Sequence, residues 1–494
     1  IEKGTKNSTI FTNYGLILIN FGKFKEAEFF IRKAIKFNPK DAIAYQNLGG
    51  ILKNQKKFIE AEFFIRKAID LNQKDAIAHQ NLGILLKDLG KLQESELSYR
   101  RAIQIKPDYA QAHYNLGIIL KDLGKFTESE LSYRKAIQIK PDYAEAHYSL
   151  GNILSNIGKF TESELSYRKA IQIKPDYAQA HYNLGNILSN IGKLTESELS
   201  YLKAIQIKPD YIKAYYSLSL LPYSNKNKIW KNQLFSNSIL DRKSKKDQIN
   251  IYFARANILH KEKNYEDSSK FLKLANQLKL TLHPSNSDTL INKSKSLFIE
   301  SIKQEINQRE YKKSKESIFI VGMPRSGSTL LESILSMNID IDDLGESEIL
   351  EQSFLDYKIS NGELNLAEKY WSRIQYYKKN SNKTTNKNLY NYLYAGIIAN
   401  KIPNSKIIHC YRNPLDNILS IYRANFTKGN RYSSSLVDCA KVYLNQEEIM
   451  SKYKNMYRSK IYDLNYDSLV SNPDEEIKSM ISWLNWKWND RYLS

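Results

Sequence analysis

The sequence predicts a multidomain protein in which an all-α repeat solenoid is followed by an α/β domain with a parallel sheet. The first observation is a set of glycines and alanines that recur every 34 residues over residues 1–212. The second is the segment IFIVGMPRSGSTLLESIL, Ile318 to Leu335, where an apolar run leads through a glycine-bracketed loop into a helical pattern. At 494 residues the chain is also longer than one domain usually is.

The repeat is marked by one glycine and one alanine per unit, because small residues let the two helices of a hairpin approach closely. This period resembles that of tetratricopeptide repeats (TPR), which stack because a single hairpin cannot bury its apolar face alone. About six repeats are therefore predicted. The glycines are Gly15, Gly49, Gly83, Gly117, Gly151 and Gly185, and the alanines are Ala34, Ala68, Ala102, Ala136, Ala170 and Ala204.

A carboxamide recurs just before the Leu-Gly pair of several repeats. The residues are Asn47, Asn81, Asn115 and Asn183, with Ser149 at the same position of another unit. They resemble the asparagine ladder of TPR proteins that hold extended peptides, in which carboxamides bond the peptide backbone irrespective of its sequence. The resemblance implies a protein or peptide partner on the concave face. The alternative is that these side chains pack or face water.

Composition excludes several classes of protein. No apolar run approaches the roughly 20 residues of a membrane span, and two cysteines are too few for a disulfide framework, which favours a cytoplasmic location. The net charge of +21 attracts anionic partners such as a phosphorylated cofactor, although lysine is abundant throughout and no nucleic-acid partner is expected. The oligomeric state stays open.

Four histidines lie one repeat apart, too far to share a metal through bonds of roughly 2 Å. They are His79, His113, His147 and His181.

The loop between Gly322 and Gly327 has the glycine spacing of the Walker A phosphate loop, with Thr329 at the hydroxyl position. Ser328 stands where that motif has its lysine, which argues against an ATPase. A loop between a strand and a helix can aim several backbone N–H groups, with the positive end of the helix dipole, at one anion. The alternative is a turn with no ligand.

The strand, P-R-S-G-[ST]-T loop and helix resemble the 5′-phosphosulfate loop of sulfotransferases that use 3′-phosphoadenosine-5′-phosphosulfate (PAPS). Arg412 after a second apolar strand, with Ser420 two turns into the next helix, resembles their 3′-phosphate motif. The chain is thus similar to bacterial TPR-linked sulfotransferases, which are related to tyrosylprotein sulfotransferases. The cofactor-binding residues that the resemblance implies are Arg325, Ser326, Gly327, Ser328, Thr329, Arg412 and Ser420, with no metal.

The same resemblance implies three catalytic side chains. Glu346, in a Gly-Glu pair after the loop helix, corresponds to the glutamate that deprotonates the acceptor hydroxyl, whereas Glu348 is expected to be a helix-face charge. Lys387 corresponds to the lysine beside the bridging oxygen of the phosphosulfate, although Asn386 replaces the family's aspartate. Arg325 completes the set. The alternative is that the glutamates complement a helix N-terminus and that the lysine is a solvated surface residue.

The predicted function is PAPS-dependent transfer of a sulfuryl group to an acceptor hydroxyl, on a tyrosine-like protein or peptide held by the repeats. Two alternatives stay open, a glycan or small-molecule acceptor and a TPR scaffold with an inactive sulfotransferase fold. The basic C-terminal loop of the family is missing, so the chain is expected to be truncated. The expected parts are a TPR solenoid (1–212), a linker (213–248), a degenerate TPR-like hairpin (249–281), a helical connector (282–316) and a sulfotransferase domain (317–494).

Overall fold

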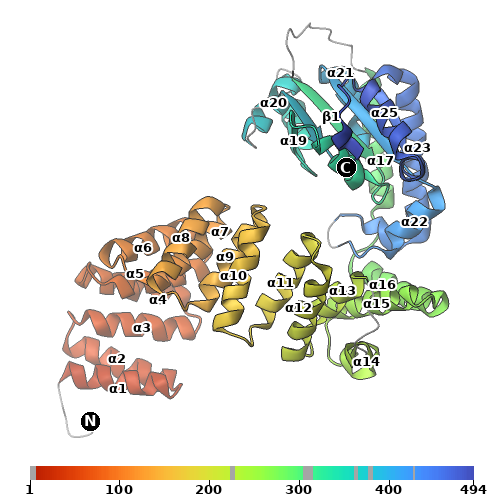
Figure 1. Ribbon diagram of the computed structural model, residues 1–494. Helices are drawn as coiled ribbons and strands as arrows, with labels where there is room; N and C mark the ends of the chain where they lie inside the picture. Colours follow the sequence, from red (N-terminus) through yellow and green to blue (C-terminus); the bar gives the residue numbers. More distant parts are fainter. Residues whose placement is uncertain are drawn as a thin grey trace. The chain divides into compact units, whose positions relative to one another are not determined.

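A computed structural model gives the structure of the chain, which divides into two compact units, Ile1–Ile239 and Leu240–Ser494 (Figure 1). No helix among the described residues is long and apolar enough to cross a membrane. The structure describes residues 7–222, 229–303, 315–360, 365–376, 382–426 and 429–493.

The N-terminal unit is built from helical hairpins, as the repeat period predicts. Helices α1 to α12 form six hairpins, each packed against the next, and α13 follows them. The all-α solenoid is thereby confirmed. The helices are α1 (Ser8–Asn20), α2 (Phe24–Phe37), α3 (Ala42–Asn54), α4 (Phe58–Leu71), α5 (Ala76–Asp88), α6 (Leu92–Ile105), α7 (Ala110–Asp122), α8 (Phe126–Ile139), α9 (Ala144–Asn156), α10 (Phe160–Ile173), α11 (Ala178–Asn190), α12 (Leu194–Ile207) and α13 (Ile212–Leu220).

Each repeat glycine lies where the two helices of its hairpin touch. A Cβ at Gly83 would come within 2.8 Å of the Tyr99 ring, closer than close-packed interiors allow. The Gly83 carbonyl also accepts a 2.7 Å hydrogen bond from Ser95 Oγ. The recurring glycine is therefore a packing requirement of the hairpin.

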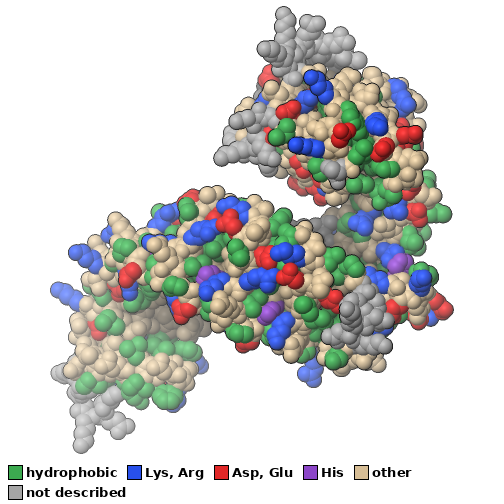
Figure 2. All heavy atoms as spheres, viewed as in Figure 1, with side chains coloured by type: hydrophobic (Ala, Val, Ile, Leu, Met, Phe, Trp, Pro, Cys, Tyr) green, Lys and Arg blue, Asp and Glu red, His purple; other side chains and the backbone are tan. Residues whose placement is uncertain are grey.

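Ion pairs on the second helices link consecutive repeats. Arg100 Nη2 lies 2.8 Å from Glu96 of its own helix and 2.6 Å from Glu128 of the next repeat. Figure 2 shows basic and acidic side chains interspersed on the visible face of the array, so part of the basic charge is paired locally. The same arrangement recurs at Arg32, Arg66, Arg134 and Arg168.

Helices continue between the array and the sheet. The stretch expected to be a linker contains short helices, and its residues 223–228 lie outside the described part. Two longer helices pack against each other where the degenerate hairpin is expected. Residues 304–314 of the expected connector also lie outside the described part. The helices are α14 (Ile229–Phe235), η1 (Asn237–Leu240), α15 (Lys245–Lys261), α16 (Tyr265–Leu282) and α17 (Ser287–Lys303).

The C-terminal unit contains a five-stranded sheet in the order β2-β3-β1-β4-β5, with every neighbouring pair parallel. The predicted α/β fold with a parallel sheet is thereby confirmed. β1 lies at the centre, with Phe319 aligned with Asn386 on one side and with Ile407 on the other. The strands are β1 (Glu316–Gly322), β2 (Ile341–Asp343), β3 (Lys383–Asn386), β4 (Ser405–Tyr411) and β5 (Ile461–Asn465).

The side chains of β1 point alternately into two cores. Phe319 and Val321 pack among residues of α19, α20, α21 and α23, while Ile318 and Ile320 pack among residues of α18 and α25. Coverage on both faces explains the continuous apolar run. The helices are α18 (Ser328–Ser336), α19 (Ile349–Ile359), α20 (Leu366–Tyr376), η2 (Leu389–Tyr394), α21 (Ala395–Lys401), α22 (Pro414–Arg423), η3 (Arg431–Ser434), α23 (Leu436–Met456), η4 (Arg458–Lys460), α24 (Tyr466–Ser471), α25 (Pro473–Trp483) and η5 (Asp490–Leu493).

Candidate active site

The loop between β1 and α18 presents a row of backbone N–H groups. From Arg325 to Thr329, these groups have no hydrogen-bond acceptor among the residues that the structure describes. Arg325 (φ 69°) and Gly327 (φ 91°) both adopt the left-handed region, and such turns direct neighbouring N–H groups toward one side. The N-terminus of α18 adds the positive end of its dipole. The loop can therefore surround an anion with backbone donors.

Two glycines fix the course of this loop. A Cβ on Gly322 would collide with the carbonyl oxygen of Cys410 in β4, and a Cβ on Gly327 would collide with the ring of Tyr466. The positive φ of Gly327 also favours glycine. Close packing thus requires both glycines of the motif, against backbone at Gly322 and against a side chain at Gly327.

Helix α22 closes one side of the loop. The buried Asn417 donates from Nδ2 to the Pro324 carbonyl at 3.1 Å. Almost one turn further, Ser420 Oγ accepts a hydrogen bond from Arg325 Nε at 3.2 Å. The structure therefore brings together two predicted cofactor residues that the resemblance assigned to different phosphate motifs.

A further cation near this loop was missed by the sequence analysis. The pKa of the half-buried Arg423 is lowered by burial and by the charge of Arg325. Two guanidinium groups in such proximity repel each other, and an oxyanion between them would relieve the repulsion. Arg423 follows Ser420 by three residues, so the two lie on one face of the helix. This spacing could have identified Arg423 from the sequence.

Arg412 follows β4 directly, at the carboxyl end of the strand. Its Nε lies 3.6 Å from Asp467 Oδ1, and its guanidinium carbon lies 5.0 Å from the centre of the Tyr466 ring. Asp467 also accepts a 3.0 Å hydrogen bond from the N–H of Asn413. Within the described chain, Arg412 Nε is a buried donor without a hydrogen-bond partner. The side chain is thus available to an anion.

The hydroxyl side chains of the loop differ in burial. Ser326 and Ser328 are buried, whereas Thr329 is exposed. Ser326 Oγ is buried and has no hydrogen-bond partner in the part of the chain that the structure describes. A buried hydroxyl without a partner is destabilising, and an oxyanion bound in the loop would supply one. The donor set therefore fits a phosphate or sulfate group.

Lys387, directly after β3, is held by an acid that the sequence analysis missed. Its Nζ lies 2.5 Å from Glu332 Oε2 and 3.7 Å from Glu346 Oε1. Lys387 is 8% exposed and Glu332 is 9% exposed, whereas the side chain of Glu346 is 74% exposed. Burial raises the pKa of Glu332 against the opposing effect of Lys387. The lysine thus has an acidic partner on α18 in place of the aspartate that Asn386 replaces.

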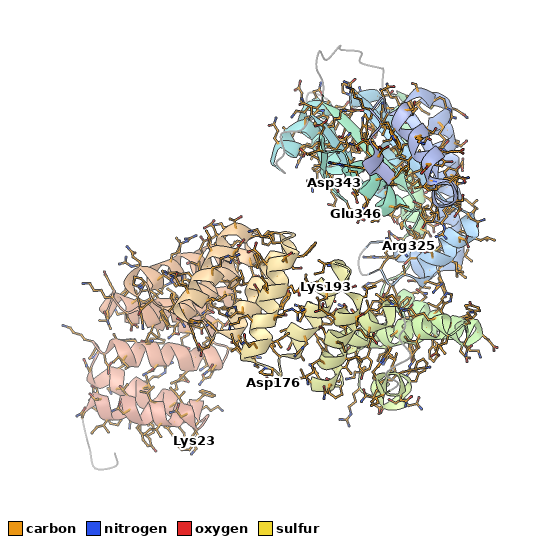
Figure 3. All side chains as sticks on the ribbon, viewed as in Figure 1. Lys23, Asp176, Lys193, Arg325, Asp343 and Glu346 are labelled. Atoms are coloured by element: carbon orange, nitrogen blue, oxygen red, sulfur yellow. The ribbon has the colours of Figure 1, made fainter. Side chains whose placement is uncertain are left out.

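Hydrogen bonds position the segment that carries Glu346. The N–H of Lys387 donates to the Gly345 carbonyl at 2.9 Å, and the N–H of Gly345 donates to Asp343 Oδ1 at 2.8 Å. Arg325, Asp343 and Glu346 lie along one side of the C-terminal unit (Figure 3). The structure thus places the predicted Glu346 and Lys387 next to each other.

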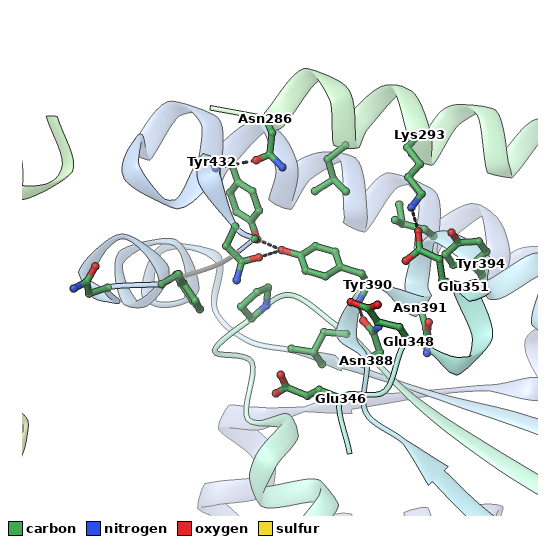
Figure 4. A pocket seen from close by; sticks show the side chains of 18 residues that line it. Asn286, Lys293, Glu346, Glu348, Glu351, Asn388, Tyr390, Asn391, Tyr394 and Tyr432 are labelled. Atoms are coloured by element: carbon green, nitrogen blue, oxygen red, sulfur yellow. Dashed lines mark hydrogen bonds and ion pairs between the residues drawn. The ribbon is translucent and has the colours of Figure 1, made fainter. Parts of the chain in front are cut away.

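A cavity of about 670 Å³ opens beside Glu346 (Figure 4). On one wall Tyr390 OH donates to Asn430 Oδ1 and lies 3.0 Å from Tyr432 OH. Pro324 of the anion loop lines the same cavity. Its volume is in the range of sites that take small molecules, so a side chain or another small group can enter next to Glu346.

The predicted asparagines of the array differ in their hydrogen bonding. Asn183 Nδ2 donates to Tyr148 OH at 3.1 Å and to Asn152 Oδ1 at 2.8 Å. Asn115 Oδ1 accepts from Gln111 at 3.2 Å. A hollow of about 720 Å³, lined mainly by α7, α9 and α11, contains Asn183 and Asn152. Asn152 was missed by the sequence analysis, although Asn186 recurs one repeat later.

The periodic histidines contact the backbone. His113 Nε2 lies 3.0 Å from the carbonyl oxygen of Pro107. The described residues contain no group of three or more His, Cys, Asp or Glu side chains suited to a metal ion. The corresponding contacts join His79 to Gln73, His147 to Pro141 and His181 to Pro175.

Both parts of the chain match models of known protein families. The sulfotransferase family matches residues 317–363 and 357–490. TPR families match most of the N-terminal unit, at residues 8–41, 30–63, 85–124, 119–158, 157–192 and 178–211.

Individual relatives match only in part. An uncharacterized protein of Aquifex aeolicus (strain VF5) is 26% identical over 267 residues, which cover 49% of this chain and 35% of that protein. This chain thus spans about a third of that relative's length. The solved structure of YrrB, described as a TPR protein with an unusual peptide-binding site, has a TM-score of 0.35 at 25% identity, over 38% of this chain and 98% of that one. Pseudomonas aeruginosa PilF has a TM-score of 0.39 at 16% identity, over 42% and 94%.

Proposed function

Because this chain is a tetratricopeptide-repeat protein with a sulfotransferase-family domain, we propose that it transfers a sulfuryl group from PAPS to an acceptor hydroxyl. The proposed acceptor is a protein or peptide, with a tyrosine-like hydroxyl, that the repeats hold. A cytoplasmic location belongs to the proposal, because Cys410 and Cys439 are both free and such thiols are typical of a reducing compartment.

The observation that carries the proposal is the row of unpaired N–H groups from Arg325 to Thr329 in the described structure. Helix N-termini with such donors bind phosphate and sulfate groups. Arg412 would hold the 3′-phosphate that distinguishes PAPS from ATP, because a guanidinium group can bond two phosphate oxygens at once. Ser420 would contribute a hydroxyl from α22.

In the proposed reaction the acceptor oxygen attacks sulfur in line, and its bond to sulfur forms as the bond from sulfur to the bridging oxygen breaks. Glu346 takes the proton of the acceptor hydroxyl. Lys387, Arg325 and the loop N–H groups stabilise the charge on the sulfuryl group and the departing phosphate. Positioning and electrostatics then account for the rate, as in phosphoryl transfer.

The distance of 3.7 Å between Lys387 Nζ and Glu346 Oε1 supports these two roles. The base must lie on the acceptor side of the sulfur and the lysine on the leaving-group side. At this distance the two groups face the same site rather than enclosing the sulfur between them, and the cavity beside Glu346 gives an acceptor access to that site.

The arrangement of the repeats supports a polypeptide acceptor. Asn47, Asn81, Asn115 and Asn183 lie on the first helices of their hairpins. A carboxamide both donates and accepts, so a row of them can bond the amides of an extended chain without reading its side chains. The hollow around Asn183 provides room for such a segment.

A transfer assay tests the proposal. The full-length protein is incubated with radiolabelled PAPS and with candidate protein, peptide and carbohydrate acceptors, and the label on each acceptor is measured. Label on a protein or peptide hydroxyl supports the proposal. Label on carbohydrate alone contradicts the acceptor class, and binding of the cofactor without transfer to any acceptor favours a scaffold with an inactive fold.

A further inference from the structure

The cavity beside Glu346 carries a negative charge that bears on which acceptors can enter it (Figure 4). We infer that the acceptor is a peptide segment with neutral or basic residues, and no acidic ones, next to the modified hydroxyl. The inference rests on the proposed function, since it concerns the acceptor side of the same site. The sulfuryl transfer itself does not require this preference for neutral or basic neighbours of the hydroxyl.

Three carboxylates line the cavity. Glu346 and Glu348 precede α19, and Glu351 lies in its first turn. Among the described lining residues Lys293 is the one basic side chain. The described wall therefore carries more acidic than basic groups.

Pairing neutralises this charge only in part. Lys293 Nζ lies 2.5 Å from Glu351 Oε1, so its charge is matched by that carboxylate. Lys387 lies 3.7 Å from Glu346 but is bound more closely by Glu332. Glu348 is exposed and has no ion-pair partner within the described chain. An unmatched carboxylate thus remains at the cavity.

The other polar groups of the wall are uncharged. Asn388, Asn391 and Asn430 carry carboxamides, and the hydroxyls of Tyr390 and Tyr432 lie 3.0 Å apart. Such groups bond neutral donors and acceptors equally well. The ring of Tyr390, which is partly exposed, can also attract a cation placed over its face. The wall can therefore receive neutral or basic side chains.

An acidic side chain in the same place would be repelled. Like charges a few ångströms apart interact more strongly beside a protein wall than in bulk water. Bound PAPS would add phosphate and sulfate charge to the site, which would increase the repulsion. A neutral residue next to the modified hydroxyl avoids this repulsion, and a basic residue there is attracted to Glu348.

A peptide series tests the inference. Three tyrosine peptides of one sequence carry Asp, Asn or Lys on both sides of the tyrosine, and kcat/KM is measured with the full-length protein and PAPS. We expect the Lys and Asn peptides to exceed the Asp peptide by about fivefold per charge, the size of an exposed ion pair. The difference should shrink as salt rises, because salt screens exposed charges.

Two variants locate the effect at Glu348. Glu348→Lys should invert the preference in favour of the Asp peptide, and Glu348→Gln should reduce it. The matched control is Glu368→Lys, which makes the same charge change at an exposed position of α20 that does not line the cavity. The control should keep the original ratio. An unchanged ratio in Glu348→Lys, or inversion in the control as well, overturns the inference.

Calorimetry with adenosine 3′,5′-bisphosphate separates this inference from the proposed function. Every variant is first shown to bind the bisphosphate as the native protein does, which excludes misfolding as the cause of a changed ratio. If the bisphosphate binds and the Asp peptide is the better substrate, the inference is wrong and the proposed function stands. If only a carbohydrate is sulfated, the inference is wrong as well. If the native protein does not bind the bisphosphate, the proposed function itself fails.

Discussion

Glu332 of α18 and Lys387 after β3 form an ion pair in which Lys387 Nζ lies 2.5 Å from Glu332 Oε2. The side chains of both residues are only about a tenth exposed, at 11% and 10%. The pair joins the helix that begins at the anion loop to the strand that precedes the predicted catalytic lysine. It therefore fixes Lys387 relative to the loop from Arg325 to Thr329.

Removing the acid of this pair should destabilise the C-terminal unit. Glu332→Gln leaves the buried Lys387 with only the exposed Glu346, 3.7 Å away, as a counter-charge, which should lower the free energy of unfolding by about 3 kcal/mol. The control is Glu448→Gln, because Glu448 pairs with Lys452 at 2.5 Å while its side chain is 59% exposed; exposed pairs contribute about 1 kcal/mol or less. Urea denaturation measures both. Equal losses in the two variants would contradict a structural role for the buried pair.

The proposed base makes a prediction about turnover. Glu346→Gln keeps the shape of the side chain but not its basicity, so kcat should fall by roughly 10²–10⁴. Binding of adenosine 3′,5′-bisphosphate should not change. Glu348→Gln, assayed with a neutral acceptor, should lower kcat far less. If the two variants retain equal kcat, Glu346 is not the base.

The repeats make a prediction about acceptor size. Replacing Asn47, Asn81, Asn115 and Asn183 by alanine removes hydrogen bonds worth about 1 kcal/mol each to a bound backbone. The KM for a protein acceptor should therefore rise at least tenfold, while kcat/KM for a minimal hydroxyl acceptor and affinity for the bisphosphate stay the same.

Two controls accompany this variant. Gln104→Ala and Gln138→Ala remove carboxamides from second helices, where each bonds a basic side chain of its own helix, and should leave both acceptors unaffected. Asn183→Ala is also measured alone, because it breaks the internal bonds to Tyr148 and Asn152. If the protein acceptor and the minimal acceptor respond alike to the fourfold change, the array is a structural platform.

Lys279 of α16 should give the stability of the C-terminal unit a pH dependence. Burial lowers its pKa to about 8, and its Nζ donates to the Phe426 carbonyl at 3.3 Å. An unfolded lysine has a pKa of about 10.4. Between about pH 8 and 10 the unfolded chain therefore binds more protons at this residue, so stability rises with pH.

Lys279→Met removes this contribution. The urea midpoint of the native protein should rise relative to that of the variant as the pH goes from 8 to 10. Lys273→Met, at an exposed position of the same helix, should give a difference that does not change with pH. A constant difference for Lys279→Met would show that this partly buried lysine keeps its ordinary titration.

The sequence predicted those features of the fold that depend on local pattern. The recurring glycines are explained by contacts such as that between Gly83 and Tyr99, which require a small residue once per hairpin. The apolar run from Ile318 to Val321 predicted a strand covered on both faces, and its residues alternate between two cores. In both cases the residues that carry the pattern lie close together in the sequence, although the contacts that require it are made in the fold.

Side chains that act through distant partners could not be identified in this way. Nothing in the sequence singles out Glu332 within α18, because its partner Lys387 is far along the chain. The substitution of aspartate by Asn386 left the acidic partner of the lysine unknown until the fold brought α18 to the end of β3. The hydrogen bond between Arg325 and Ser420 likewise depends on tertiary structure.

Calorimetric titration with adenosine 3′,5′-bisphosphate and with ATP tests the central claim most directly. The loop lacks the Walker lysine, and Arg412 and Ser420 are the proposed site of a second phosphate, so the protein should bind the bisphosphate more tightly than ATP. Arg412→Ala should weaken bisphosphate binding by about 1.5–3 kcal/mol, the loss of a charged hydrogen bond, with little effect on ATP. Equal or tighter binding of ATP, or normal bisphosphate binding by Arg412→Ala, would contradict the account.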